Sequence, residues 1–168
     1  KQFQSIENID GWQDKITPLI SSLIDKTIDQ FNVKGIENLD KDTSYLFVSN
    51  HRDITMDPML VNYALVLSGL KTSKVAIGDN LLHRPFVAKL MRLNKSFVVK
   101  RSVTARREKL ESTQTLSAYI HDSLKNKHNV WIAQKEGRSK DNFDKTDTAV
   151  LKMLHMTGRK LGWEFKDS

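Results

Sequence analysis

The sequence has no cysteine among its 168 residues. Disulfide bonds, a thiolate nucleophile and a cysteine-ligated zinc site are therefore excluded. Long apolar runs are missing too, since the longest, residues 59–70, is interrupted by Asn62, Ser68 and Gly69. It falls short of the roughly 20 residues that cross a bilayer. There is neither a Gly-rich nucleotide loop nor a Gly-x-Ser-x-Gly elbow, and the missing elbow argues against a serine nucleophile.

Charge is unevenly distributed along the chain. The whole sequence carries +7, but residues 71–140 contain sixteen Lys or Arg against five Asp or Glu, so this half carries +11. A basic half predicts an anionic partner: a phosphate-bearing substrate, an anionic membrane or a nucleic acid. It contains only four aromatic residues. Few side chains are thus available to stack on bases, which makes nucleic acid the weaker interpretation.

Short apolar runs alternate with helical patterns. Hydrophobic residues make up 39% of the chain and charged residues 28%, a balance typical of one globular domain at this length. Apolar residues recur at helical spacing near the start, and we expect an N-terminal amphipathic helix over residues 12–32, packed on the domain. Further helices are expected over residues 57–67, 85–91, 103–124 and 148–156, and strands over residues 45–49, 74–78, 96–100 and 130–133. This alternation predicts the α/β class, with a layered sheet and flanking helices.

A histidine with two carboxylates close behind it follows the first expected strand. His51 is followed by Asp53 and Asp57, and Pro58 comes next. A carboxylate on one imidazole nitrogen fixes the tautomer and raises the basicity of the other nitrogen, so this stretch predicts an acid–base pair. Asp57-Pro58 is also an ordinary helix start. Both aspartates remain candidates, and we favour Asp57 because an irregular loop over residues 52–56 can fold it back onto His51.

Three blocks, in this order, resemble those of the PlsC-like glycerolipid acyltransferases. Residues 50–57 resemble the NHxxxxD block, residues 95–101 the GxxFIxR block and residues 136–138 the EGxR block. Four departures stand out. Val98 and Val99 replace the Phe-Ile pair of the second block. The aspartate of the first block comes six positions after the histidine instead of five, Lys95 takes the place of the glycine, and Arg138 follows the glutamate by two positions instead of three. The match suggests a divergent bacterial branch that resembles the 1-acylglycerol-3-phosphate acyltransferases.

The resemblance implies direct attack of an acceptor hydroxyl on an acyl thioester, without an acyl-enzyme. His51 would be the general base and Asp57 its partner. The blocks imply as substrate-binding residues Asn50, Arg52, Lys100, Arg101, Glu136, Gly137 and Arg138. Arginine suits an acceptor phosphate because its donors form a planar fork. Side chains alternate along a strand, so only one of Lys100 and Arg101 can face a shared pocket, and the family pattern favours Arg101.

The expected co-substrates are acyl-CoA or acyl-carrier protein as donor and a glycerol phosphate or lysophospholipid as acceptor, with no metal, no other cofactor and no nucleic acid. We expect a peripheral protein at the cytoplasmic, inner face of the membrane, held on anionic lipid by basic and apolar patches. The family's fourth block does not follow residues 136–138, so residues 1–168 are expected to be a single acyltransferase-like domain that lacks its C-terminal part. Two alternatives stay open: a basic nucleic-acid-binding module, and a lipid-binding relative that has lost catalysis.

Overall fold

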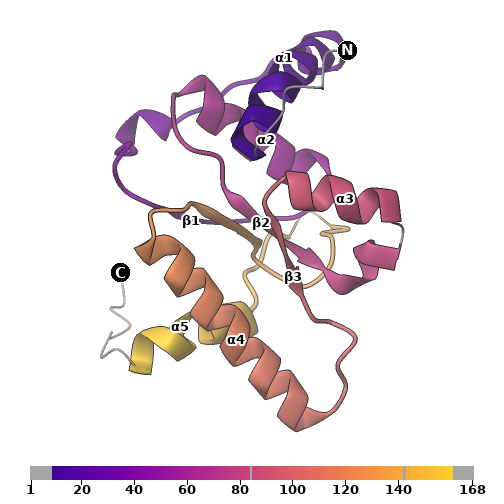
Figure 1. Cartoon of the computed structure of the whole chain (residues 1–168), viewed down its shortest axis with the longest axis vertical. Coiled ribbons are helices and arrows are strands. Elements are labelled where there is room, and N and C mark those ends of the chain that lie inside the picture. Colours follow the sequence, from indigo (N-terminus) through magenta and orange to yellow (C-terminus); the bar gives the residue numbers. More distant parts are fainter. Residues whose placement is uncertain (1–8, 84, 142, 161–168) are drawn as a thin grey trace.

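Four short parallel strands form the centre of the molecule (Figure 1). The structure is a computed structural model that describes residues 9–83, 85–141 and 143–160. The strands are β1 (Leu46–Ser49), β2 (Lys74–Gly78), β3 (Ser96–Val99) and β4 (Val130–Ala133), in the spatial order β1-β4-β2-β3. They are apolar on both faces, as expected of parallel strands covered on both sides. Their carboxyl ends meet at one edge of the sheet.

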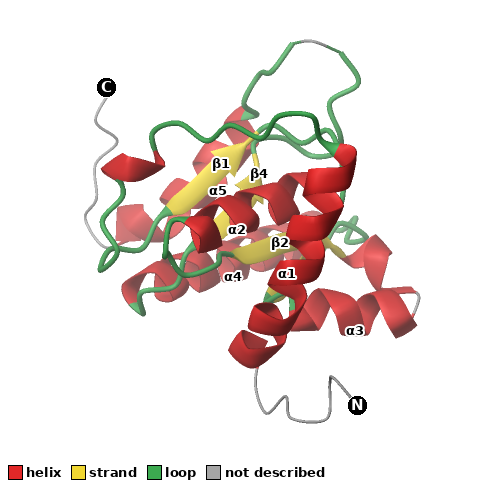
Figure 2. Cartoon of the chain, turned by 90° about the horizontal axis from the view of Figure 1, so that it is seen from above, coloured by secondary structure: helices red, strands yellow, loops and turns green. Residues whose placement is uncertain are grey.

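Helices cover both faces of the sheet (Figures 1 and 2). They are α1 (Ile9–Thr27), α2 (Met56–Leu67), α3 (Pro85–Leu93), α4 (Arg106–Lys125) and α5 (Thr148–Lys160), with short 3₁₀ turns η1 (Ile36–Asn38) and η2 (Asp79–His83). Figure 1 shows α1 and α2 on one side and α4 and α5 on the other. The expected α/β layered architecture is confirmed.

The core is divided by the sheet into two clusters. On the side of α4 and α5, Ile120 and Met153 pack against Val130 and Ile132 of β4. On the other side, Trp131 of the same strand packs with Val75 and Ile77 of β2. Successive side chains of a strand point to opposite faces. Alternate residues of β4 therefore pack in the two different core clusters, one on each face of the sheet.

Two helices are shorter than the sequence predicted, and α3 and α5 end a few residues later than expected. The helix expected over residues 12–32 ends at Thr27, and Phe31 packs against Tyr63 from the following loop, with ring centroids 5.6 Å apart. Likewise α4 begins only at Arg106, and Val103 lies in the loop before it. In both cases an apolar residue in helical register is half-buried from a loop. Hydrophobic periodicity reports burial, and a loop can bury a side chain as well as a helix can.

A left-handed residue connects α3 to β3. Lys95 has φ +55°, and its N–H donates to the Arg92 carbonyl at 3.1 Å, closing the last turn of α3. This is the position at which helices commonly end in glycine. It is also the position where the family block has glycine, so the departure at Lys95 keeps the turn but places a side chain in it.

Within the described residues, no helix is both long enough and apolar enough to cross a membrane.

Candidate active site

The loop after β1 folds the Asp57 carboxylate back onto His51. Asp57 Oδ2 accepts hydrogen bonds from His51 Nδ1 at 2.9 Å, from the Arg52 N–H at 2.6 Å and from the Asp53 N–H at 3.0 Å. The two side chains are only 13% and 22% exposed. With Nδ1 held by the carboxylate, Nε2 is the ring nitrogen that remains to exchange a proton. This arrangement is that of an oriented general base.

Asp53 has a different task. Its Oδ1 accepts the N–H groups of Thr55 and Met56, each at 2.8 Å, and so caps the start of α2. These two backbone bonds, with Met56 first, hold the pKa of Asp53 below its ordinary value. The structure therefore pairs His51 with Asp57. The turn that Asp53 stabilises accommodates the extra residue that separates this block from the family spacing.

His51 shares a cavity with two arginines. The cavity has a volume of about 280 Å³ and lies at the carboxyl ends of β2 and β4. Arg101, from the end of β3, and Arg138, from the loop after β4, line it together with His51, and Gly137 contributes backbone. The tertiary structure thus gathers one residue or more from each of the three blocks around one space. A residue that can accept a proton, His51, and two arginines therefore line the same cavity.

Gly78 makes room for Arg101. A Cβ atom on Gly78 would lie 3.1 Å from both Cδ and Nε of Arg101, and would also collide with the Asn80 side chain. The next residues tie β2 to β3, because Asp79 Oδ2 accepts Ser102 Oγ at 2.6 Å and the Ser102 N–H at 3.2 Å. These bonds, the hydroxyl first, lower the pKa of Asp79. Ser102, the residue after Arg101, is therefore fixed to the end of β2, and Gly78 leaves room for the Arg101 side chain.

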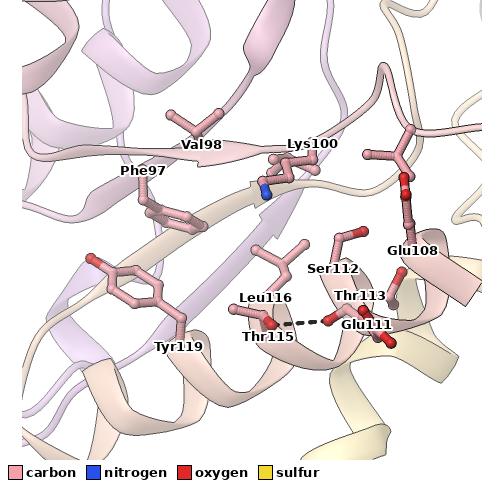
Figure 3. Close-up of a pocket in the computed structure, with 12 residues that line it drawn as sticks. Phe97, Val98, Lys100, Glu108, Glu111, Ser112, Thr113, Thr115, Leu116 and Tyr119 are labelled. Carbon is pink, nitrogen blue, oxygen red and sulfur yellow. Dashed lines mark hydrogen bonds between the residues drawn. The ribbon is translucent and has the colours of Figure 1, made fainter.

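Lys100 does not line the His51 cavity and lies on the face of the sheet that α4 covers. It lines a separate groove of about 550 Å³ between β3 and α4, together with Phe97 and Tyr119, whose ring centroids are 4.9 Å apart. Figure 3 shows the Lys100 side chain in this groove and Val98 of the same strand pointing away from α4. Only one of the two residues lines the His51 cavity, as expected, and it is Arg101. Strand alternation is not the reason: β3 ends at Val99, and the chain beyond it places Lys100 in the groove of Phe97.

Three further residues predicted to bind substrate do not line the His51 cavity. Asn50 Nδ2 and Arg52 Nη2 both donate to Asp144 Oδ2, at 2.9 and 3.1 Å. Glu136 is exposed in the turn after β4. Gly137, in contrast, has φ +77°, a left-handed conformation in which any side chain would be strained. The glycine of the third block is required by the turn itself.

Trp131 packs behind His51. Its side chain is buried, and its ring meets the imidazole edge-on, with centroids 5.8 Å apart and an interplanar angle of 71°. Trp131 Nε1 donates to Ser49 Oγ at 3.1 Å, and that hydroxyl donates to the Asn50 carbonyl at 2.9 Å. Trp131 lies in the strand expected over residues 130–133, but the sequence offered no signal that it would contact the histidine. Its contact restricts the imidazole to one plane.

An apolar cavity of about 250 Å³ adjoins the His51 cavity. Ile54, Val75 and Ile77 line both. The remaining walls come from α1, α2 and α3, through residues that include Ile16, Ile20, Pro58, Met59, Val66 and Met91. Sequence reasoning assigned the apolar stripe of α1 to packing on the domain. It missed that part of the stripe borders a cavity, because periodicity cannot distinguish a filled contact from an unfilled one.

Among residues 9–83, 85–141 and 143–160, no three His, Asp or Glu side chains are grouped so that they could hold a metal ion.

Comparison with known proteins gives a consistent result. No curated protein matches the chain significantly. The crystal structure of the 1-acyl-sn-glycerophosphate (LPA) acyltransferase PlsC from Thermotoga maritima matches with a TM-score of 0.54 and 20% sequence identity, over 92% of this chain. The match covers 58% of that PlsC chain, so this chain spans a little over half of its length. The family model named Acyltransferase matches residues 30–167. The chain therefore belongs to the Acyltransferase family and has the fold of the PlsC-like glycerolipid acyltransferases.

Proposed function

We propose that this domain transfers a fatty acyl group from an acyl thioester to the hydroxyl of a glycerol phosphate or lysophospholipid, with His51 as general base. The observation that carries the proposal is the shared cavity, which is lined by His51, itself held by Asp57, and by Arg101 and Arg138. Acyl transfer to a phosphorylated alcohol needs a base for the hydroxyl proton and cations for the phosphate. Both are present within one space of about 280 Å³.

The reaction proceeds by direct attack. The acceptor hydroxyl gives its proton to His51 Nε2 while its oxygen bonds to the thioester carbonyl carbon. The C–S bond of the tetrahedral intermediate then breaks, and the proton on His51 passes to the departing sulfur. Asp57 stabilises the imidazolium that exists between these steps. A positioned base of this kind typically contributes about 10²- to 10⁴-fold in rate.

Arg101 and Arg138 are proposed to hold the acceptor phosphate. Both line the cavity that contains His51. A guanidinium can bind two phosphate oxygens at once, which fixes the direction of the acceptor as well as its affinity. Two such groups opposite a base would present the acceptor hydroxyl to the base.

The adjoining apolar cavity is proposed to take the first part of the acyl chain. It shares Ile54, Val75 and Ile77 with the wall of the His51 cavity. A thioester carbonyl beside His51 would place the methylene groups among these side chains. Each buried methylene stabilises binding by about 0.8 kcal/mol, so a hydrophobic wall at this point favours a fatty acyl donor. The donor carrier, CoA or acyl-carrier protein, is left to experiment.

We also propose peripheral association with an anionic membrane at its cytoplasmic face. Two features support it: the basic half, residues 71–140, and the exposed side chains of Leu19 and Leu23 on α1, one turn apart. Apolar side chains beside a basic surface are typical of proteins that bind a lipid interface. The acceptor of this reaction is itself found in membranes if it is a lysophospholipid.

The test is release of free thiol from acyl-CoA by the full-length protein, with a panel of phosphorylated and unphosphorylated acceptors. Release should depend on a phosphorylated acceptor, and His51→Ala should remove nearly all of it while circular dichroism stays unchanged. If the variant keeps more than about a tenth of the wild-type rate, His51 is not the base. Acceptor binding without thiol release would favour the alternative of a lipid-binding relative that has lost catalysis.

A further inference from the structure

Described residues between β4 and α5, 134–141 and 143–147, run back over the His51 segment. The Ser139 N–H donates to the His51 carbonyl at 2.6 Å, and the Gln134 N–H donates to the Ser49 carbonyl at 2.8 Å. The loop closes on itself where the Asp147 N–H donates to the Gln134 carbonyl at 2.8 Å. Figure 2 shows loops gathered beyond the arrowheads of β1 and β4, where this crossing occurs.

One carboxylate of this loop holds both neighbours of His51. Asp144 Oδ2 accepts Asn50 Nδ2 at 2.9 Å and Arg52 Nη2 at 3.1 Å. These bonds, with Asn50 first, hold the pKa of Asp144 below its ordinary value, so the group is a carboxylate at neutral pH. The residues before and after His51 are therefore tied to the same atom, about ninety positions away in the chain.

Arg52 connects this contact to the base. Its side chain binds Asp144, while its backbone N–H donates to Asp57 Oδ2, the oxygen that also accepts His51 Nδ1. A shift of the Arg52 backbone would remove one of the three donors that orient the Asp57 carboxylate. The Ser139 bond to the His51 carbonyl fixes the same segment from its other side.

We infer that Asp144 is a positioning residue for the proposed base: through Asn50 and Arg52 it holds the segment in which His51 and Asp57 meet. This inference rests on the proposed function. Asp144 does not line the His51 cavity, so it acts through its partners and has no contact with the reacting atoms. Asn50 and Arg52, predicted from sequence to bind substrate, serve the geometry of the base instead.

Exposure separates this role from a general contribution to stability. The side chains of Arg52 and Asp144 are 50% and 35% exposed. Ion pairs between exposed side chains typically contribute little to folding. In contrast, small misplacements of a catalytic group can reduce a rate about 100-fold. Loss of Asp144 should therefore lower the rate strongly, while the thermal midpoint of unfolding should change little.

Asp144→Ala in the full chain tests the inference, and Asp141→Ala is the matched control. Asp141 is an exposed aspartate of the same loop whose Oδ1 accepts the Phe143 N–H, within the loop itself. We expect Asp144→Ala to lower kcat by about ten- to a hundredfold with KM for both substrates nearly unchanged, and Asp141→Ala to match the wild type. Asp144→Asn, which keeps an acceptor oxygen for Arg52, should recover part of the loss.

An NMR titration of the His51 imidazole provides a readout that does not depend on turnover. In Asp144→Ala the hydrogen-bonded Nδ1 proton should weaken or exchange faster than in the wild type, and in Asp141→Ala it should not. If the wild type shows no acyl transfer but the NMR difference appears, the proposed function fails and the positioning role stands. An Asp144→Ala variant with unchanged kcat and unchanged His51 signals overturns the inference. A rise in acceptor KM alone also overturns it, since Asn50 and Arg52 would then contact substrate.

Discussion

Asp57 Oδ2 gathers three donors, and two of them belong to the backbone that immediately follows His51. The carboxylate is thus oriented mainly by main-chain groups of the loop in which it lies. The imidazole is in turn confined by Trp131, which meets it edge-on. At this scale the site is a rigid pair, in which the carboxylate selects the tautomer and the indole limits rotation of the ring.

Asp57→Asn and Asp53→Asn are the same chemical change on the two candidate aspartates. Asp57→Asn should reduce kcat by at least about a hundredfold, because an amide can present its NH₂ group to Nδ1 and stabilise the wrong tautomer. Asp53→Asn should leave the rate near that of the wild type, since asparagine caps a helix about as well as aspartate. Steady-state kinetics of the purified variants decides this. If Asp53→Asn is the more damaging change, the pairing seen in the structure is not the one that serves catalysis.

Arg101→Ala should raise KM for the phosphorylated acceptor by roughly ten- to a hundredfold, because a charge-assisted hydrogen bond contributes about 1.5–3 kcal/mol. KM for the donor should change little. Lys100→Ala is the matched control, since Lys100 lies in the β3–α4 groove and should leave both KM values nearly unchanged. Equal losses with phosphorylated and phosphate-free acceptors would contradict the phosphate-binding role of Arg101.

At the scale of elements, the turn from α3 into β3 shows how this chain tolerates a departure from the family pattern. Lys95 adopts φ +55°, and its side chain donates from Nζ to Thr72 Oγ1 at 3.0 Å. A left-handed conformation costs a residue other than glycine about 1–2 kcal/mol. The side-chain hydrogen bond offsets part of this cost, so the turn survives with lysine at the glycine position.

Comparison of Lys95→Gly with Lys95→Ala isolates the backbone contribution. Both variants lose the bond to Thr72, but only the alanine variant keeps a Cβ atom in the left-handed conformation. We expect the glycine variant to have the larger free energy of unfolding, by about 1 kcal/mol. For a domain of this size that difference shifts the thermal midpoint by about 2–4 °C. An alanine variant as stable as the glycine variant would show that the turn is not strained.

At the scale of the whole molecule, basic charge and exposed apolar side chains are the features that bear on partners. Residues 71–140 carry +11, and Leu19 and Leu23 are exposed on α1. A charged surface attracts anionic lipid over about one Debye length, which is about 10 Å at 0.1 M salt. Apolar insertion, in contrast, is insensitive to screening by salt.

Association with vesicles that contain anionic lipid should therefore fall steeply as salt is raised from about 0.05 M to 0.5 M. Sedimentation with vesicles measures this, and vesicles of neutral lipid alone are the control. Binding that does not change with salt would mean that apolar insertion alone holds the protein. Tight, salt-sensitive binding to DNA without binding to vesicles would favour the nucleic-acid alternative.

Local patterns were enough to predict the order and type of the elements. Each strand is a short apolar run bounded by polar or glycine residues, and β2 and β4 begin and end where the sequence predicts. Parallel strands bring their carboxyl ends together, so the three blocks could be expected at one edge of the sheet. These features depend on residues within a few positions of each other, and a single sequence contains all of that information.

The tertiary structure decided between the candidates that the sequence left open at that edge. His51 pairs with Asp57 because the loop between them turns at the Asp53 cap. Asp144 reaches Asn50 across 94 positions, and no local pattern marks it. Such contacts depend on the path of loops and on the room beside them, as Gly78 provides for Arg101. The sequence by itself determined the layered α/β fold, the candidate base and its favoured partner Asp57, while the contacts of Trp131 and Asp144 around that pair depended on long-range packing that local chemistry does not encode.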